Sequence, residues 1–239
     1  MTPKIPIFRL KREAKALSRE ASISHTAALD RIARKHGYNN WSLLAGQYDR
    51  HATDRVFINA LQPGDMALVA GRPGHGKTLY TLRMLVHAIR QGRQAWFFTL
   101  VWNLQDLLGK LEQIGEAARG LQEGLRFDNS DDICSGYIRD KLADSPRNTV
   151  VVIDYLQVLD QQREKPDLQS QILDLKSFAV TRGVNMLFIS QIDRRFELSR
   201  KAQPDLNDIR LPNPLSLNAF SKACFIVDSD LSSTVEIVD

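Results

Sequence analysis

The feature that most constrains the fold of this 239-residue chain is the segment GRPGHGKT, which runs from Gly71 to Thr78. It matches the pattern G-x-x-x-x-G-K-[ST] in full. A short apolar run, MALVA, precedes it, and the apolar side chains of residues 77–91 after it have helical spacing. Because this pattern binds phosphate between a strand and a helix, its setting predicts a phosphate-binding loop in an α/β domain rather than a chance glycine-rich turn.

Each residue type in this loop has a physical role. Glycines let the backbone curl so that its N–H groups point inward, and the helix start adds partial positive charge. The Lys77 side chain is expected to reach the outer phosphates, and the Thr78 hydroxyl to ligate Mg²⁺. The predicted nucleotide-contacting residues are Gly71, Arg72, Pro73, Gly74, His75, Gly76, Lys77, Thr78 and Leu79.

A second motif, VVIDYLQVLD, spans residues 151–160. Its apolar beginning predicts a buried strand that ends on Asp154. Ligands bind at the carboxyl edge of open α/β sheets, so Asp154 is predicted to hold Mg²⁺ beside the phosphate loop. The alternative, a carboxylate that only caps a loop, is less favoured because the two motifs occur together.

Apolar runs alternate with helical patterns along residues 56–239, which we expect to form the nucleotide-binding domain. This alternation predicts a mostly parallel, twisted sheet with helices on both faces. Strands are expected at residues 66–70, 94–100, 149–154, 185–190 and 222–228, and helices at 77–91, 104–115 and 167–182.

Residues 1–50 have a different character. Apolar spacing predicts one helix over residues 4–21, and Ser24 is a suitable N-cap for a second helix that ends at Gly37. This segment has ten Lys and Arg residues against four Asp and Glu residues, whereas the remainder has 22 against 24. The sequence predicts a small basic helical module, whose charge fits either an acidic partner, nucleic acid included, or a solvated helix surface.

Composition argues against several protein classes. No apolar run approaches the roughly 20 residues that a membrane-spanning helix needs, and no secretory signal follows the basic N-terminus. Cys134 and Cys224 stand far apart without metal-ligand spacing, which favours reduced thiols. We therefore expect a cytoplasmic protein without a membrane partner.

Four segments resemble the RecA-like motor domain of DnaB-type replicative helicases. They are residues 61–78, residues 151–160, FISQIDRRFE at 188–197 and PDLNDIR at 204–210. The resemblance covers about residues 57–230 and leaves out the N-terminal module. It implies a RecA-like P-loop fold preceded by an unrelated small helical module.

The resemblance also implies a biochemical activity. It implies a protein that binds ATP and Mg²⁺, forms a homo-oligomeric ring or filament, a hexameric ring included, and engages single-stranded DNA. Lys77 and Asp154 would then serve catalysis, and Gln191 would sense the γ-phosphate and couple it to DNA-binding loops. Candidate nucleic-acid contacts are Arg194, Arg195, Arg163 and Lys165.

The chain departs from that family at two catalytic places. Val101 occupies the position of the glutamate that activates the attacking water, and valine cannot polarise water. Asp106 is a neighbour that could substitute, but we expect it on the following helix. Ala202 and Gln203 stand where the family has cations that reach the adjacent subunit's site. Candidate replacements for these trans-acting cations are Arg200, Lys201 and Arg210.

The segment RLPNPLSLNAF, residues 210–220, also differs from the family pattern. Its prolines predict a rigid, extended path. Its apolar residues either dock a protein partner, as residues 1–50 could also do, or pack as a surface loop. Among the aromatic residues, Trp96, Phe97 and Phe98 are expected in the core, and Trp102 near the nucleotide edge has no assigned role.

Two functions follow from these observations. The first is an ATP-binding, DnaB-like RecA-fold protein that acts on or with single-stranded DNA, with slow or impaired hydrolysis because of Val101. The second is a nucleotide-gated interaction or regulatory module without helicase activity. Both need the phosphate loop and Asp154, whereas Val101 and Gln203 favour the second.

Overall fold

The chain folds as two units, Met1–Thr53 and Asp54–Asp239. The structure is a computed structural model. The residues that it describes are 7–41, 44–45, 52–113, 121, 123–160, 166–198, 201, 203–211, 213–228 and 231–236.

The N-terminal unit is helical where it is described. Helix α1 spans Ile7–Glu20 and α2 spans His25–Lys35. The Ser24 side chain caps α2 by accepting a hydrogen bond from the backbone N–H of Ala27, as its sequence position predicts. A small apolar cluster joins the helices, and its buried members are Leu10, Ala14, Ala28, Ile32, Ala33 and Leu44.

The second unit is built on one seven-stranded sheet, with the strand order β3-β2-β4-β5-β1-β6-β7. Every neighbouring pair is parallel except β6 and β7, which are antiparallel. The strands are β1 (Met66–Gly71), β2 (Ala95–Thr99), β3 (Leu125–Asp128), β4 (Val150–Asp154), β5 (Asn185–Gln191), β6 (Lys222–Asp228) and β7 (Leu231–Glu236). The predicted α/β fold with a mostly parallel sheet is confirmed.

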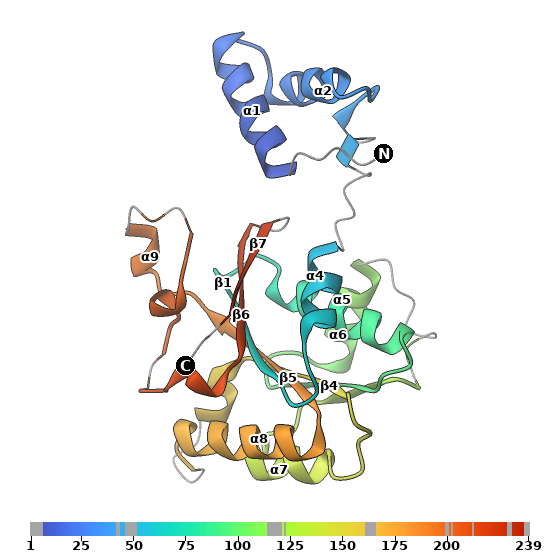
Figure 1. The fold of residues 1–239 in the computed structure, drawn as a ribbon, viewed down its shortest axis with the longest axis vertical. Helices are drawn as coiled ribbons and strands as arrows, with labels where there is room; N and C mark the ends of the chain where they lie inside the picture. The colour runs from blue at the N-terminus through green and yellow to red at the C-terminus, as the bar shows by residue number, and fades with distance from the viewer. Residues whose placement is uncertain are drawn as a thin grey trace. The chain divides into compact units, whose positions relative to one another are not determined.

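Helices cover both faces of this sheet (Figure 1). Helices α4, α5 and α6 pack on one face, and α7 and α8 pack on the other. Their bounds are α4 (Ala52–Ala60), α5 (Lys77–Arg90), α6 (Leu104–Gln113), α7 (Ser135–Lys141) and α8 (Leu168–Arg182). A short helix α9 (Arg195–Leu198) and three 3-10 turns, Leu156–Asp160, Leu206–Asp208 and Leu217–Ala219, complete the described elements.

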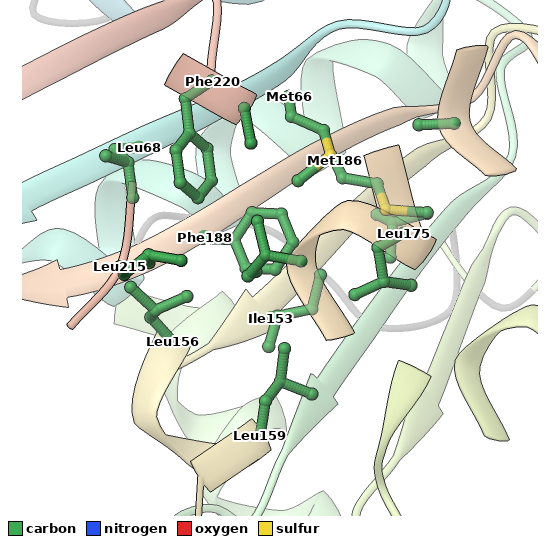
Figure 2. Close-up of a cluster of buried hydrophobic side chains, with 14 of the residues drawn as sticks. Met66, Leu68, Ile153, Leu156, Leu159, Leu175, Met186, Phe188, Leu215 and Phe220 are labelled. Atoms are coloured by element: carbon green, nitrogen blue, oxygen red, sulfur yellow. The ribbon is translucent and has the colours of Figure 1, made fainter. Parts of the chain in front are cut away.

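Strand alternation divides the core between the two faces. On the α7/α8 face, Ile153 and Phe188 lie among the buried side chains that Figure 2 shows, and the Phe188 and Phe220 rings meet edge to face with centroids 5.4 Å apart. On the α5 face, residues of the opposite parity, such as Val152 and Ile189, are buried. Asp154 and Gln191 share this second parity, so both lie on the α5 face of the sheet.

Several elements were not predicted from the sequence. Strand β3 has four residues, none fully buried, and β7 reads LSSTVE, so neither has the apolar run that indicates a strand. Helix α7 is only seven residues long and contains a glycine. Phe97 and Phe98 are fully buried, as expected of core residues.

No helix within the described ranges combines the length and the apolar character that a bilayer-spanning segment requires.

Candidate phosphate-binding site

The loop between β1 and α5 has the backbone shape that its glycines predicted. Gly74 and Gly76 have φ of 79° and 78°, a left-handed conformation that side-chain-bearing residues rarely adopt. A Cβ built on Gly71 would lie 2.9 Å from the carbonyl oxygen of Ile226, so only glycine fits there. Helix α5 begins at Lys77 without a side-chain cap from Gly76, which leaves its first N–H groups suited to an anion.

Lys77 lies over its own loop. Its ammonium Nζ donates to the carbonyl oxygen of Arg72 at 2.9 Å. Burial lowers the pKa of Lys77, and the negative charge of Asp154 acts in the opposite direction. A partly desolvated ammonium next to a glycine-rich backbone is suited to bind a phosphate oxygen.

Asp154 ends β4 at the carboxyl edge of the sheet, in register with Thr99 of β2. Asp154 is 4% exposed, and its oxygen Oδ2 accepts hydrogen bonds from Thr78 Oγ1 at 3.0 Å and from Trp102 Nε1 at 2.9 Å. Burial raises the pKa of Asp154, while these two bonds and the charges of Lys77 and Lys110 oppose the rise. The fold therefore joins the phosphate loop to the strand-ending carboxylate directly.

The pair of Thr78 and Asp154 has the chemistry of a magnesium site. A hydroxyl and a carboxylate are oxygen ligands of the kind Mg²⁺ prefers, and their side chains meet at 3.0 Å beside the phosphate loop. The residues present therefore fit Mg²⁺ together with phosphate.

Trp102 is the residue of this site that the sequence did not assign. Its indole N–H bonds Asp154, and the Lys110 ammonium lies 3.9 Å from its ring centroid. The signal that could have found it is its place just after a strand that neighbours β4, at the edge where Asp154 ends.

Gln191 ends β5 in register with Gly71, so it lies at the same sheet edge as the phosphate loop. The segment after the Leu206–Asp208 turn runs beside it. The Arg210 backbone N–H donates to the Gln191 carbonyl at 2.7 Å, and Arg210 Nη1 lies 3.5 Å from Gln191 Oε1. Gln157 Nε2 donates to the Arg210 carbonyl at 2.9 Å, so Arg210 links the end of β5 to the 3-10 turn that follows β4.

Val101 follows β2 at the sheet edge where Asp154 ends, and its side chain carries no polar group. Its side chain is 48% exposed, and its backbone N–H donates to Thr99 Oγ1 at 3.0 Å. Asp106 lies in the first turn of α6, where its carboxylate accepts from the Asn103 N–H at 3.0 Å. Asp106, the substitute that the sequence suggested for the expected glutamate, is therefore engaged in capping α6.

The remaining candidates are the trans-acting cations and the nucleic-acid contacts that the sequence suggested. Lys201 pairs with Asp205 at 2.9 Å and with Asp208 at 3.0 Å, both in its own chain. Arg194 and Arg195 are exposed, and Arg195 pairs with Asp193. The candidates Arg163, Lys165 and Arg200 lie outside the described residues.

The apolar residues of the 210–220 segment face the core where they are described. Leu215, Ala219 and Phe220 are buried in the cluster on the α7/α8 face, and Leu211 and Leu217 pack against it. This packing favours the surface-loop interpretation over a docking surface for a partner.

Comparison with solved structures finds the same fold in ATPases. One solved ATPase domain gives a TM-score of 0.55 at 17% identity, and the match covers 73% of this chain and 81% of that domain. A DnaB-like replicative helicase, described with its interactions with primase, gives a TM-score of 0.59 at 15% identity, with 96% of this chain and 74% of its own covered. At such low identity the likeness establishes a RecA-like fold and nothing finer.

A comparison with family models gives a different kind of match. The model described as "Glyoxalase superfamily protein" matches residues 1–72, which take in the N-terminal unit and continue through α4 and β1. Within the described part of the chain, no group of three or more His, Cys, Asp and Glu residues could hold a metal ion. Comparison with curated proteins finds no match. The helicase resemblance of the sequence did not predict the match to residues 1–72.

Proposed function

We propose that this protein binds ATP with Mg²⁺ through its RecA-like unit and hydrolyses it slowly. The observation that carries the proposal is the hydrogen bond between Thr78 and Asp154, which joins the phosphate loop to the strand-ending carboxylate in one site. Few other ligands need this combination of inward N–H groups, an ammonium, a hydroxyl and a buried carboxylate.

Each side chain then has a role in binding. Backbone N–H groups at the start of α5 and the Lys77 ammonium hold the phosphates. Thr78 and Asp154 hold the magnesium ion, which when bound neutralises phosphate charge. Gln191, at the same sheet edge, is the proposed sensor of the terminal phosphate, and its two contacts with Arg210 connect it to the segment after residue 204.

Slow hydrolysis follows from the side chains that come after β2 and β5 at this edge of the sheet. Val101 carries no acid or base, and Asp106 is engaged in capping α6. Asp193 is likewise engaged, because its carboxylate accepts from the Arg195 N–H at 2.8 Å. Loss of a general base typically costs about 10²–10⁴ in rate. Binding is thereby kept while turnover is reduced.

Single-stranded DNA and further copies of the chain are the proposed partners. The solvent side of α1 carries Arg9, Arg12, Lys15 and Arg19, all exposed, opposite its buried Leu10 and Ala14. Such a cationic helix face suits a phosphate backbone. Arg194 and Arg195, exposed after β5, are the proposed contacts in the RecA-like unit.

A second function is favoured by one observation. Lys201, a candidate trans-acting cation, is paired with two carboxylates of its own chain. A protein that holds ATP without a trans-acting cation would use the bound nucleotide to control partner contacts rather than to move along DNA.

The experiment measures two quantities on the intact protein. The first is binding of a fluorescent ATP analogue with Mg²⁺, and the second is steady-state ATP hydrolysis with and without single-stranded DNA. Tight binding with slow turnover that DNA accelerates supports the ATPase function. Tight binding with turnover that DNA leaves unchanged supports the gated module, and absence of binding contradicts both.

A further inference from the structure

The loop between β2 and α6 is fixed at both ends. At its start, Thr99 Oγ1 accepts the backbone N–H of Val101 at 3.0 Å, a short side-chain turn. At its end, Asn103 and Asp106 form a reciprocal cap, since each side chain accepts the other's backbone N–H at 3.0 Å. Val101, which is part of the first tie, and Trp102, which lies between the two ties, therefore have a defined orientation.

These two residues point in different directions. The Val101 side chain is half exposed, whereas Trp102 packs against the apolar cluster beneath α5. The Trp102 indole N–H donates to Asp154 Oδ2 at 2.9 Å. The side chain that this loop directs at the Asp154 carboxylate is therefore Trp102 and not the residue at the expected glutamate position.

Lys110 contacts the face of the Trp102 ring. Its ammonium, on α6, lies 3.9 Å from the ring centroid, within the range of a cation–π contact. The indole thus lies between a carboxylate at its N–H and an ammonium on its face. Both contacts restrict the rotation of the side chain.

We propose that Trp102 is the positioning residue for Asp154, and through it for the magnesium ion of the nucleotide site. This inference rests on the proposed nucleotide function. A carboxylate that is 4% exposed needs hydrogen-bond donors to stay in one orientation. Thr78 and Trp102 both donate to Oδ2, and they differ in whether they can also ligate a metal ion.

The Thr78 oxygen has lone pairs and can ligate a metal ion while its O–H still donates a hydrogen bond to Asp154. An indole N–H is a donor only, so Trp102 can orient Asp154 but cannot ligate the ion. Groups that orient a metal-binding side chain in this way commonly change metal affinity by about 10–100-fold when removed. Trp102 therefore sets how well Asp154 binds magnesium.

The test is Trp102→Phe, which removes the N–H and keeps an aromatic ring beneath Lys110. A fluorescent ATP analogue is titrated in EDTA and then with increasing Mg²⁺. We expect the Mg²⁺ midpoint to rise about 10-fold while the affinity in EDTA stays unchanged. Lys110→Met, which keeps the N–H and loosens the ring, is expected to raise the midpoint about threefold.

Trp96→Phe is the matched control. Trp96 lies on β2 and packs on the α7/α8 face of the sheet, whereas Trp102 packs on the α5 face. The Trp96 ring stacks on Phe98 with centroids 5.3 Å apart, and its indole nitrogen has no hydrogen-bond partner within the described structure. Its loss should leave the Mg²⁺ midpoint unchanged.

Two results would contradict the role of Trp102 without contradicting the proposed nucleotide function. One is a Mg²⁺ midpoint in Trp102→Phe equal to that of the unaltered protein. The other is an affinity loss of equal size in EDTA, which would mean that the ring supports the nucleotide or the fold. A protein that binds no nucleotide in either condition overturns the proposed function as well.

Discussion

Two loops at the same sheet edge differ in how far they follow the family pattern. The β1–α5 loop, Gly71–Thr78, has the glycine conformations, the partly buried ammonium and the hydroxyl that suit phosphate and magnesium. The β2–α6 loop, residues 100–103, carries Val101 and Trp102 and not the catalytic carboxylate that the helicase resemblance implies. In the proposed function, the first loop supplies the binding groups, and the second lacks the acid–base group for turnover.

Under the proposed function, nucleotide binding and turnover therefore depend on separate segments of the chain. The shape of the first loop is set by left-handed conformations at Gly74 and Gly76 and by the start of α5. The second is equally well fixed, by Thr99 at one end and by the Asn103–Asp106 cap at the other. The second loop is thus an ordered alternative to a catalytic loop, and substitutions in the two loops should have different consequences.

The largest effect is expected from Lys77→Ala, in the binding loop. Charge-assisted hydrogen bonds are worth about 1.5–3 kcal/mol each, so loss of the ammonium should weaken ATP binding on the order of 100-fold. Equilibrium titration with a fluorescent ATP analogue measures it. Arg90→Ala, an exposed cation at the other end of α5, is the control and should bind normally. Equal affinity of Lys77→Ala and the unaltered protein would place the nucleotide elsewhere.

The next effect is expected from Val101→Glu, in the other loop. A restored carboxylate at this half-exposed position should raise ATP turnover on the order of 100-fold, with little change in ATP affinity. Steady-state hydrolysis at saturating ATP measures it. Val101→Gln has nearly the same size without an acid or base, and it should not raise turnover. If the glutamine variant is equally fast, the gain comes from shape or polarity and not from general-base catalysis.

A smaller effect concerns stability and pH. Burial raises the pKa of Asp154, so the folded state holds the Asp154 proton more tightly than the unfolded state does. Stability of the ligand-free protein should therefore fall as the pH rises from the usual carboxyl range, about 4, through the raised value. The Asp154→Asn side chain cannot ionise, so this variant should be more stable than the unaltered protein at neutral pH, with a flatter pH dependence.

Urea unfolding in EDTA, at acidic and neutral pH, measures this difference. Asp174→Asn, a surface carboxylate paired with Arg139, is the control and should change stability little. A less stable Asp154→Asn protein at neutral pH would mean that the hydrogen bonds to the ionised carboxylate outweigh its burial.

The smallest effect is expected from Lys201→Ala. Lys201 is bound to Asp205 and Asp208 of its own chain, so its removal should change ATP turnover less than about threefold. A trans-acting cation would instead contribute about 10³–10⁵. A loss of that size in DNA-stimulated hydrolysis would show that Lys201 leaves its partners and serves a neighbouring subunit.

The sequence predicted what is encoded locally. The parallel sheet, the glycine loop and the strand ending on Asp154 each follow from short patterns with known geometry. Strands β3 and β7 were missed because they lack an apolar run of their own and are defined by pairing with β2 and β6.

The role of Trp102 was missed for a related reason. Its bond to Asp154 joins residues that are 52 positions apart, and its direction depends on the Thr99 turn and the cap of α6. Likewise, the pairing of Lys201 with Asp205 and Asp208 depends on the folded path of that segment, which its sequence does not specify.

The most direct test of the central claim is single-turnover hydrolysis with Mg²⁺ and radiolabelled ATP, using protein in excess so that all ATP is bound. The account predicts that the unaltered protein binds the ATP and returns it largely intact over the time in which Val101→Glu converts it to ADP. Prompt conversion by the unaltered protein would contradict the account, because it would mean that the β2–α6 loop does not limit turnover.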